Sequence, residues 1–137
     1  MNDSPRTGGC LCGAIRYEVA GEMRPVIACH CGQCRRTSGH HVAATSAPRE
    51  TVRVTGEVSW YASSEDARRG FCLTCGSNPF WDGPGANLSI FAGTLDDAAG
   101  LRFAGHIFTA DKGAYYDIPH GERAAPGADP SLTTQVP

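Results

Sequence analysis

Apolar and polar residues alternate in short runs along this chain, and no run keeps a helical period over ten or more residues. Alternation over about four to eight residues is typical of strands with one buried face, as in AIRYEVA at residues 14–20. Further strands are predicted at residues 25–29, 42–47, 51–54, 58–62, 69–72, 78–82, 87–92, 102–108 and 114–118. Single helical turns are predicted within residues 31–39 and 95–99, so we expect a mainly β protein.

Composition agrees with short strands joined by many turns. The chain has 137 residues, enough for one domain, with 17 glycines and nine prolines. We divide it into a domain of residues 1–120 and an irregular C-terminal tail of residues 121–137, which is rich in Pro, Ala and Gly. Composition leaves open whether this tail lies against the domain as an extended arm or is mobile.

Charge and hydropathy exclude several classes of partner. The formal net charge is -2, and Lys112 is the only lysine. A chain without a basic face is poorly suited to nucleic acids or anionic membranes. No apolar stretch approaches the roughly 20 residues that cross a bilayer. Because the opening residues MNDSPRTGG lack the apolar core of a signal peptide, we expect a cytoplasmic protein.

Seven cysteines form three tight clusters, and none lies outside a cluster. The clusters are Cys10 and Cys12, then Cys29, Cys31 and Cys34, then Cys72 and Cys75. An odd number cannot be fully paired into intramolecular disulfides, and clustered thiols in the cytosol more often hold metal. Four thiolates close a tetrahedral zinc site, whereas three leave one position open. The seven cysteines therefore suggest one structural and one reactive metal.

The first and last pairs are candidates for the structural metal. Each pair is followed directly by a glycine, Gly13 or Gly76, which permits a tight turn that brings backbone N–H groups near the thiolates. A metal shared by these pairs would tie the start of the chain to its middle and stabilise a small β domain. The alternative is two unrelated pairs of buried thiols.

The middle cluster, CHCGQC at residues 29–34, is the candidate reactive site. Three sulfurs this close in sequence can occupy three corners of a tetrahedron. His30 is expected to point away, because a residue between two ligands usually does so. His40, His41 or His106 could instead supply a fourth ligand, which would make the metal structural. Without a histidine ligand, the fourth position is free for water or a thiol.

Charged residues near this cluster are candidate substrate contacts. Arg35 and Arg36 follow it directly and can offset the charge of three thiolates or bind a substrate carboxylate. His40 can donate to a substrate oxygen, although a solvated loop is the alternative for each of these side chains. We predict Arg35 and His40 as substrate-binding residues. The pair Asp96–Asp97 is interpreted as helix-capping rather than acid–base, because neighbours in a turn face different directions.

Five strings resemble the glutathione-dependent formaldehyde-activating enzyme (GFA) family, which includes proteins of the centromere protein V type. They are GGCLCGAIRYEV, CHCGQCRRTSG, FCLTCGS, FAGTLDD and HIFTADKGAYYDI, in this order. The resemblance extends from about Gly8 to about Pro119. It implies a β-tent fold of small antiparallel sheets, shared with a zinc-binding chaperone of Rab GTPases, with zinc sites in the connecting loops.

The resemblance also implies two zinc ions per chain and an activity. The structural zinc would take Cys10, Cys12, Cys72 and Cys75, and the catalytic zinc would take Cys29, Cys31 and Cys34. The implied reaction is addition of glutathione to formaldehyde, which gives S-(hydroxymethyl)glutathione and is formally a carbon–sulfur lyase reaction in reverse. The alternative is a non-catalytic zinc-binding protein-interaction module, which the open three-cysteine site disfavours.

Overall fold

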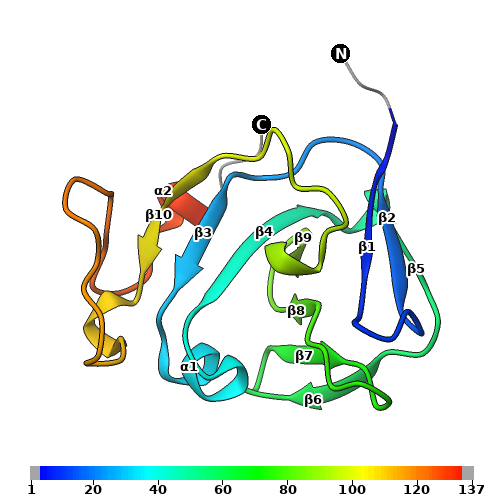
Figure 1. Ribbon diagram of the computed structural model, residues 1–137, viewed down its shortest axis with the longest axis horizontal. Coiled ribbons are helices and arrows are strands. Elements are labelled where there is room, and N and C mark those ends of the chain that lie inside the picture. The colour runs from blue at the N-terminus through cyan, green and yellow to red at the C-terminus, as the bar shows by residue number, and fades with distance from the viewer. Residues whose placement is uncertain (1–3, 134–137) are drawn as a thin grey trace.

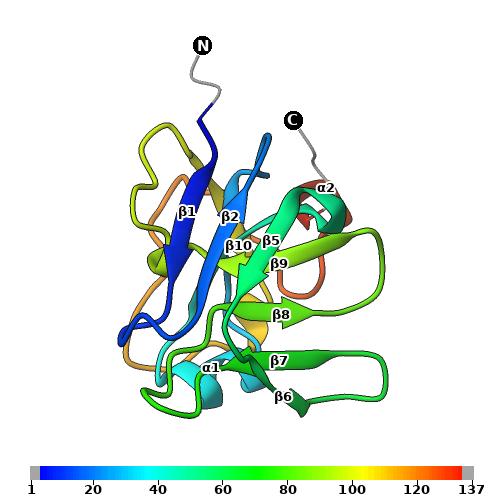
Figure 2. The same ribbon diagram turned by 90° about the vertical axis from the view of Figure 1, so that its right-hand side faces the viewer.

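Two β-sheets form the body of the protein in a computed structural model that describes residues 4–133 (Figures 1 and 2). The smaller sheet has the order β1 (Arg6–Gly9), β2 (Arg16–Val19) and β5 (Val52–Thr55). The larger sheet has the order β10 (Phe103–Ile107), β3 (Val26–Cys29), β4 (Val42–Pro48), β9 (Asn87–Phe91), β8 (Phe80–Asp82), β7 (Arg68–Phe71) and β6 (Ser59–Ala62). These pairs are antiparallel except β10 and β3, which run parallel. The mainly β prediction is confirmed.

Helices are few and short. The described helices are α1 (Gly32–Ser38), α2 (Pro130–Thr133) and the 3-10 turns η1 (Arg49–Thr51), η2 (Ala92–Thr94) and η3 (Thr109–Asp111). The segment predicted as one helical turn after Cys31 is therefore a seven-residue helix, and Gly39 ends it in the left-handed conformation at φ 83°. None of the helices described between residues 4 and 133 could span a lipid bilayer.

Two local predictions differ from the structure, and one strand has no signal in the sequence. The strand β1 has the sequence RTGG, which does not alternate; it forms by antiparallel pairing with β2. Residues 114–118 form no strand. Residues 95–99 form no helical turn, since the 3-10 turn η2 ends just before them and Leu95 instead bridges Gly8.

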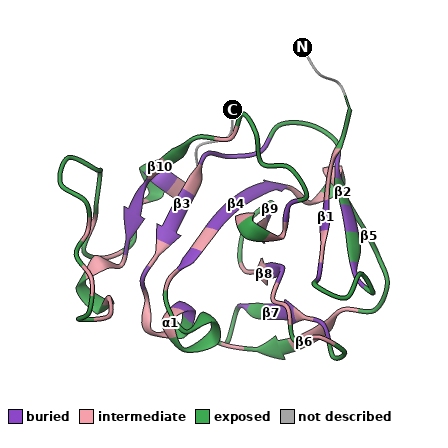
Figure 3. Ribbon diagram, in the orientation of Figure 1, coloured by how far each residue is buried: buried purple, intermediate pink, exposed green. Residues whose placement is uncertain are grey.

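The main core lies between the two sheets. From the smaller sheet it includes Tyr17 and Val19, with Ile15 just before β2, and from the larger sheet it includes Phe80 and Ile90. The rings of Tyr17 and Phe80 meet edge to face with centroids 5.4 Å apart. Figure 3 shows the buried positions running along β4 and β3, while the peripheral loops are exposed. The alternation in β2 thus buries one face of that strand against the larger sheet.

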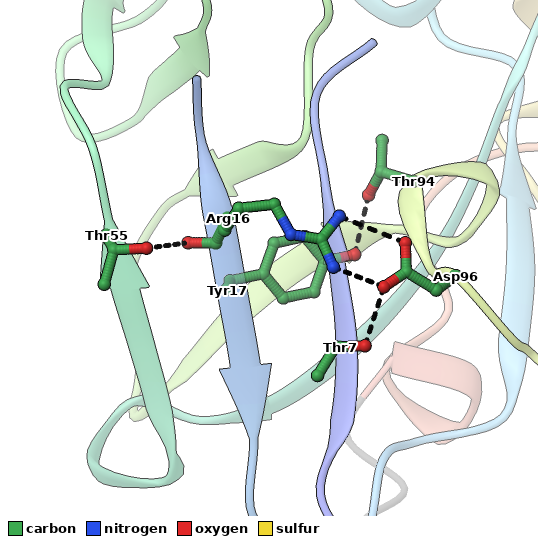
Figure 4. Close-up of polar contacts among 6 residues, drawn as sticks. All are labelled: Thr7, Arg16, Tyr17, Thr55, Thr94 and Asp96. Atoms are coloured by element: carbon green, nitrogen blue, oxygen red, sulfur yellow. Dashed lines mark hydrogen bonds and ion pairs between the residues drawn. The ribbon is translucent and has the colours of Figure 1, made fainter. Parts of the chain in front are cut away.

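Polar contacts hold the smaller sheet to the loop after η2 (Figure 4). The carboxylate of Asp96 accepts from Thr7 Oγ1 at 2.7 Å and from both terminal nitrogens of Arg16. The Tyr17 hydroxyl contacts Thr94 Oγ1 at 2.7 Å. Asp96 is therefore an ion-pair partner of β2 and not the helix cap that the sequence suggested.

The described part of the C-terminal tail lies along β10. Backbone bonds join His106 N to Arg123 O at 2.9 Å, Ala125 N to His106 O at 2.9 Å and Phe108 N to Gly127 O at 3.0 Å. In α2, Leu132 is 1% exposed and packs with Ile27 and Ile107. Residues 121–133 thus form an extended arm over the domain, while residues 134–137 of the predicted tail lie outside the described residues.

Candidate functional site

Four cysteines meet where the two sheets approach each other. Cys10 and Cys12 lie in the turn between β1 and β2, whereas Cys72 and Cys75 lie between β7 and β8. Their sulfurs all lie within 4.8 Å of one another, with Cys12 Sγ 3.7 Å from Cys10 Sγ and 3.8 Å from Cys72 Sγ. A tetrahedral zinc site with Zn–S bonds of about 2.3 Å has edges of about 3.8 Å. The four sulfurs therefore fit one metal ion.

Backbone turns present these sulfurs to one another. Gly13 and Gly76 take the positive φ values, 85° and 80°, that glycine adopts without strain. Ile15 N donates to Cys10 Sγ at 3.2 Å, an interaction that favours a thiolate. The hydrogen bond with the Ser77 hydroxyl lowers the pKa of Cys75 to about 5. By contrast, contacts with the other three sulfurs raise the pKa of Cys12 to about 11, so without a metal this group keeps part of its protons.

Three further cysteines meet at the end of β3 and the start of α1. Cys29 ends β3, Cys31 is the N-cap of α1, and Cys34 lies buried in its first turn. Their sulfurs also lie within 4.8 Å of one another, and Cys34 N donates to Cys31 Sγ at 3.3 Å. Both predicted cysteine groups therefore come together in space, and each can hold a metal ion.

The three sulfurs share their protons unequally. Hydrogen bonds from the thiols of Cys29 and Cys34 lower the pKa of Cys31 to about 2, while contact with Cys31 and Cys34 raises the pKa of Cys29. One thiolate is therefore stabilised by two thiol neighbours. A divalent cation held by these three cysteines would replace the remaining protons, because metal ligands must be deprotonated.

None of the described histidines joins this group of sulfurs. His30, which stands between Cys29 and Cys31, has both ring nitrogens engaged elsewhere. Its Nδ1 lies 2.6 Å from the Tyr116 hydroxyl and its Nε2 lies 2.9 Å from His106 Nδ1. Burial, with neighbouring His41 and His106, lowers the pKa of His30 to about 4, so this ring is neutral near pH 7. The expectation that His30 points away from the metal agrees with these contacts.

These contacts belong to a chain of hydrogen bonds that ends on the C-terminal arm. His106 Nε2 lies 2.7 Å from Glu122 Oε1. Because a carboxylate only accepts, His106 donates from Nε2 and accepts at Nδ1 when it is neutral. His30 must then donate from Nε2 and accept the Tyr116 O–H at Nδ1. The order of donation is therefore Tyr116 to His30 to His106 to Glu122.

The two predicted substrate contacts lie near this chain. His40 is exposed and its Nδ1 hydrogen-bonds the Tyr115 hydroxyl, while its ring centroid is 4.6 Å from that of Tyr116. Arg35 is half-buried on α1, one residue after Cys34. Burial raises the pKa of Tyr116, and the nearby charge of Arg35 opposes that shift. Arg35 and His40 thus both approach Tyr116.

Arg69 contacts the three-cysteine group and was not predicted from the sequence. It lies on β7, is 4% exposed, and donates from Nη2 to Cys34 Sγ at 3.7 Å and Gln33 Oε1 at 3.3 Å. Neighbouring residues of a strand face opposite sides of the sheet. Gly70 pairs with Phe80 of the main core, so the preceding residue, Arg69, faces away from that core. The contact joins segments 35 residues apart, which sequence spacing does not reveal.

A separate hollow of ≈ 200 Å³ lies on the smaller sheet. Its lining consists of Thr7, Arg16, Tyr17, Glu18, Arg53 and Thr55. Arg16 is paired with Asp96, and Arg53 lies 3.8 Å from Glu18. None of the seven cysteines lines this hollow.

Comparison with known proteins identifies the family. The model of a family described as glutathione-dependent formaldehyde-activating enzyme matches residues 5–111. The chain belongs to this GFA family. A relative, an uncharacterized lyase of Schizosaccharomyces pombe (strain 972 / ATCC 24843), is 35% identical over 122 residues, covering 81% of this chain and 83% of the relative. Together these findings support a lyase of the GFA type.

Proposed function

We propose that this protein is a zinc-dependent carbon–sulfur lyase that acts on a thiol–aldehyde adduct, of the S-(hydroxymethyl)glutathione synthase type. Membership of the GFA family and the lyase name of the relative support the reaction class. The observation that carries the proposal is the group of three sulfurs from Cys29, Cys31 and Cys34, which no described histidine joins. Such a group leaves one position for an exchangeable ligand.

The proposed cofactor is zinc, two ions per chain. Cys10, Cys12, Cys72 and Cys75 would hold a structural ion, and Cys29, Cys31 and Cys34 would hold a catalytic one. When bound at the second site, zinc would favour the thiolate form of an incoming thiol at neutral pH. Both candidate sites offer only sulfur donors, which suit zinc, and the sulfurs lie at distances that one ion can bridge.

The proposed reaction joins a thiol to an aldehyde without an external oxidant or reductant. The thiol loses its proton, the sulfur–carbon bond forms, and the carbonyl oxygen takes up a proton to become a hydroxyl group. The reverse direction cleaves the same bond. Arg35 and His40 are proposed to bind the substrate. Their approach to Tyr116, which hydrogen-bonds His30 between Cys29 and Cys31, supports this role. Glutathione is the proposed thiol because of the family name.

Calorimetric titration of the zinc-loaded protein with glutathione tests this proposal. We expect saturable binding of about one glutathione per chain. S-methylglutathione, which lacks the free thiol, should not bind, and the Cys31→Ser variant should lose glutathione binding while keeping its fold. If wild-type protein binds neither glutathione nor another small thiol, the lyase proposal fails and the alternative, a protein-interaction module, is favoured.

Catalysis is tested separately with formaldehyde and glutathione. Exchange between the free aldehyde and its glutathione adduct is followed by NMR, and the wild-type protein should accelerate it above the spontaneous rate. Arg35→Gln and His40→Gln should each slow this exchange. Both should raise the glutathione concentration needed for half-maximal rate more than they lower the maximal rate. Arg36→Gln, on the exposed side of the same helix, is the matched control and should change little.

A further inference from the structure

Arg69 is a buried cation whose charge is not balanced by a carboxylate. Only 4% of this residue is exposed, and within residues 4–133 it forms no ion pair with Asp or Glu. Its Nε and Nη1 are buried and lack a hydrogen-bond partner in the same part of the chain. An isolated guanidinium in such a position is costly, because burial removes its hydration. A negative charge close to Arg69 would therefore stabilise the buried guanidinium.

The sulfur of Cys34 is the group that can supply this charge. Arg69 Nη2 lies 3.7 Å from Cys34 Sγ, and Gln33 holds the guanidinium in place. Gln33 accepts from Arg69 through Oε1 and donates through Nε2 to Ser63 O at 2.9 Å. A divalent cation with three thiolates carries a net charge of about -1. One arginine balances that charge.

We propose that Arg69 is the counter-cation of the three-cysteine centre and that it makes the centre prefer an anionic sulfur ligand over a neutral one. The inference rests on the proposed function in taking Cys29, Cys31 and Cys34 as metal ligands. A fourth thiolate makes the centre more negative, and a fixed positive charge a few ångströms away reduces that cost. Arg69 is a positioning residue in this scheme, because it acts on the ligand through the charge of the cysteines.

The test uses protein loaded with cobalt(II), whose visible absorption reports the ligands of each site. Two probes are titrated, 2-mercaptoethanol as the sulfur ligand and imidazole as the neutral one. In Arg69→Met we expect thiol affinity to fall about ten-fold or more, with imidazole affinity unchanged or higher. Arg69→Lys should restore most of the thiol affinity by returning the charge. Arg68→Met is the matched control, because Arg68 is exposed, pairs with Asp82 and should leave both affinities within about two-fold.

The proposal would be overturned if Arg69→Met lost affinity for 2-mercaptoethanol and imidazole equally, or lost affinity for neither. If Arg69→Met does not fold, Arg69→Gln replaces it, since an amide can still donate to Cys34 without carrying charge. Competition with a chromogenic chelator separates this inference from the proposed function. If wild type binds no thiol, the lyase proposal and the ligand preference both fail. Faster release of one metal from Arg69→Met than from Arg68→Met would then support only the charge balance between Arg69 and the three-cysteine centre.

Discussion

At the scale of single residues, His30 shows how hydrogen bonds can exclude a side chain from a metal site. It stands between two cysteines, but Tyr116 and His106 occupy its ring nitrogens. We therefore predict that His30→Gln keeps the zinc content of wild type while its unfolding free energy falls by about 1–3 kcal/mol through lost buried hydrogen bonds. Metal analysis and urea unfolding measure both quantities. Loss of one zinc would identify His30 as a ligand.

Tyr17 provides a test of burial at the same scale. Burial raises the pKa of Tyr17 from 10.0 to about 12, so the unfolded chain releases this proton at lower pH than the folded chain does. Stability from this group is present below pH 10 and declines as the pH rises towards 12. Tyr17→Phe keeps the ring against Phe80 but loses the contact with Thr94, at a cost of about 1 kcal/mol near pH 8.

The pH dependence distinguishes Tyr17 from an ordinary core residue. The stability difference between wild type and Tyr17→Phe, measured by urea unfolding at pH 8 and pH 11, should narrow at the higher pH. Tyr61→Phe is the control, because Tyr61 is 63% exposed and should show no such change. An unchanged difference for Tyr17→Phe would mean that its hydroxyl is not held in the protonated form.

At the scale of elements, the C-terminal arm is an added edge to the larger sheet. Leu132 anchors it between β3 and β10, so Leu132→Ala should lower the unfolding free energy by about 2–5 kcal/mol and speed proteolysis within residues 121–133. Leu73→Ala is the matched control, since Leu73 is 80% exposed. Equal protease sensitivity of the two variants would show that Leu132 does not hold the arm.

The elements that could be predicted from the sequence are those with a local signal. Alternation located β2, and the strands predicted at residues 42–47 and 51–54 correspond to β4 and β5. The strand β1 has no such signal, because RTGG is ordered by pairing with β2. The order of the larger sheet, with β10 beside β3 in parallel, likewise depends on contacts between distant segments.

In the candidate site, too, residues with a local sequence signal were predictable and residues brought in from distant segments were not. The cysteine groups were predictable because a metal site made from C-x-C and C-x2-C pairs is encoded by short spacing. Arg69 was not, since it reaches Cys34 from an element remote in sequence. The same holds for Tyr116, which contacts His30, and for Glu122, which contacts His106. Two arginines adjacent to the cluster, Arg35 and Arg36, drew the expectation of charge compensation, yet Arg69 is the one in contact with Cys34.

At the scale of the whole molecule, the four-cysteine group joins the two sheets and the three-cysteine group does not. Cys10 and Cys12 belong to the turn of the smaller sheet, and Cys72 and Cys75 belong to the larger one. Removing a ligand there should detach the sheets from each other, so Cys72→Ser is expected to be largely unfolded by circular dichroism and by proton NMR. A folded Cys72→Ser variant would show that the core holds the sheets together without the metal.

The central claim is that four cysteines hold the fold while three hold an exchangeable metal. The most direct test is to measure the number of zinc ions per chain in purified wild type and Cys31→Ser by elemental mass spectrometry. Thermal unfolding of both proteins is measured in parallel. We predict about two zinc ions in wild type and about one in a folded Cys31→Ser variant. One zinc in wild type, or unfolding of Cys31→Ser, would contradict the division.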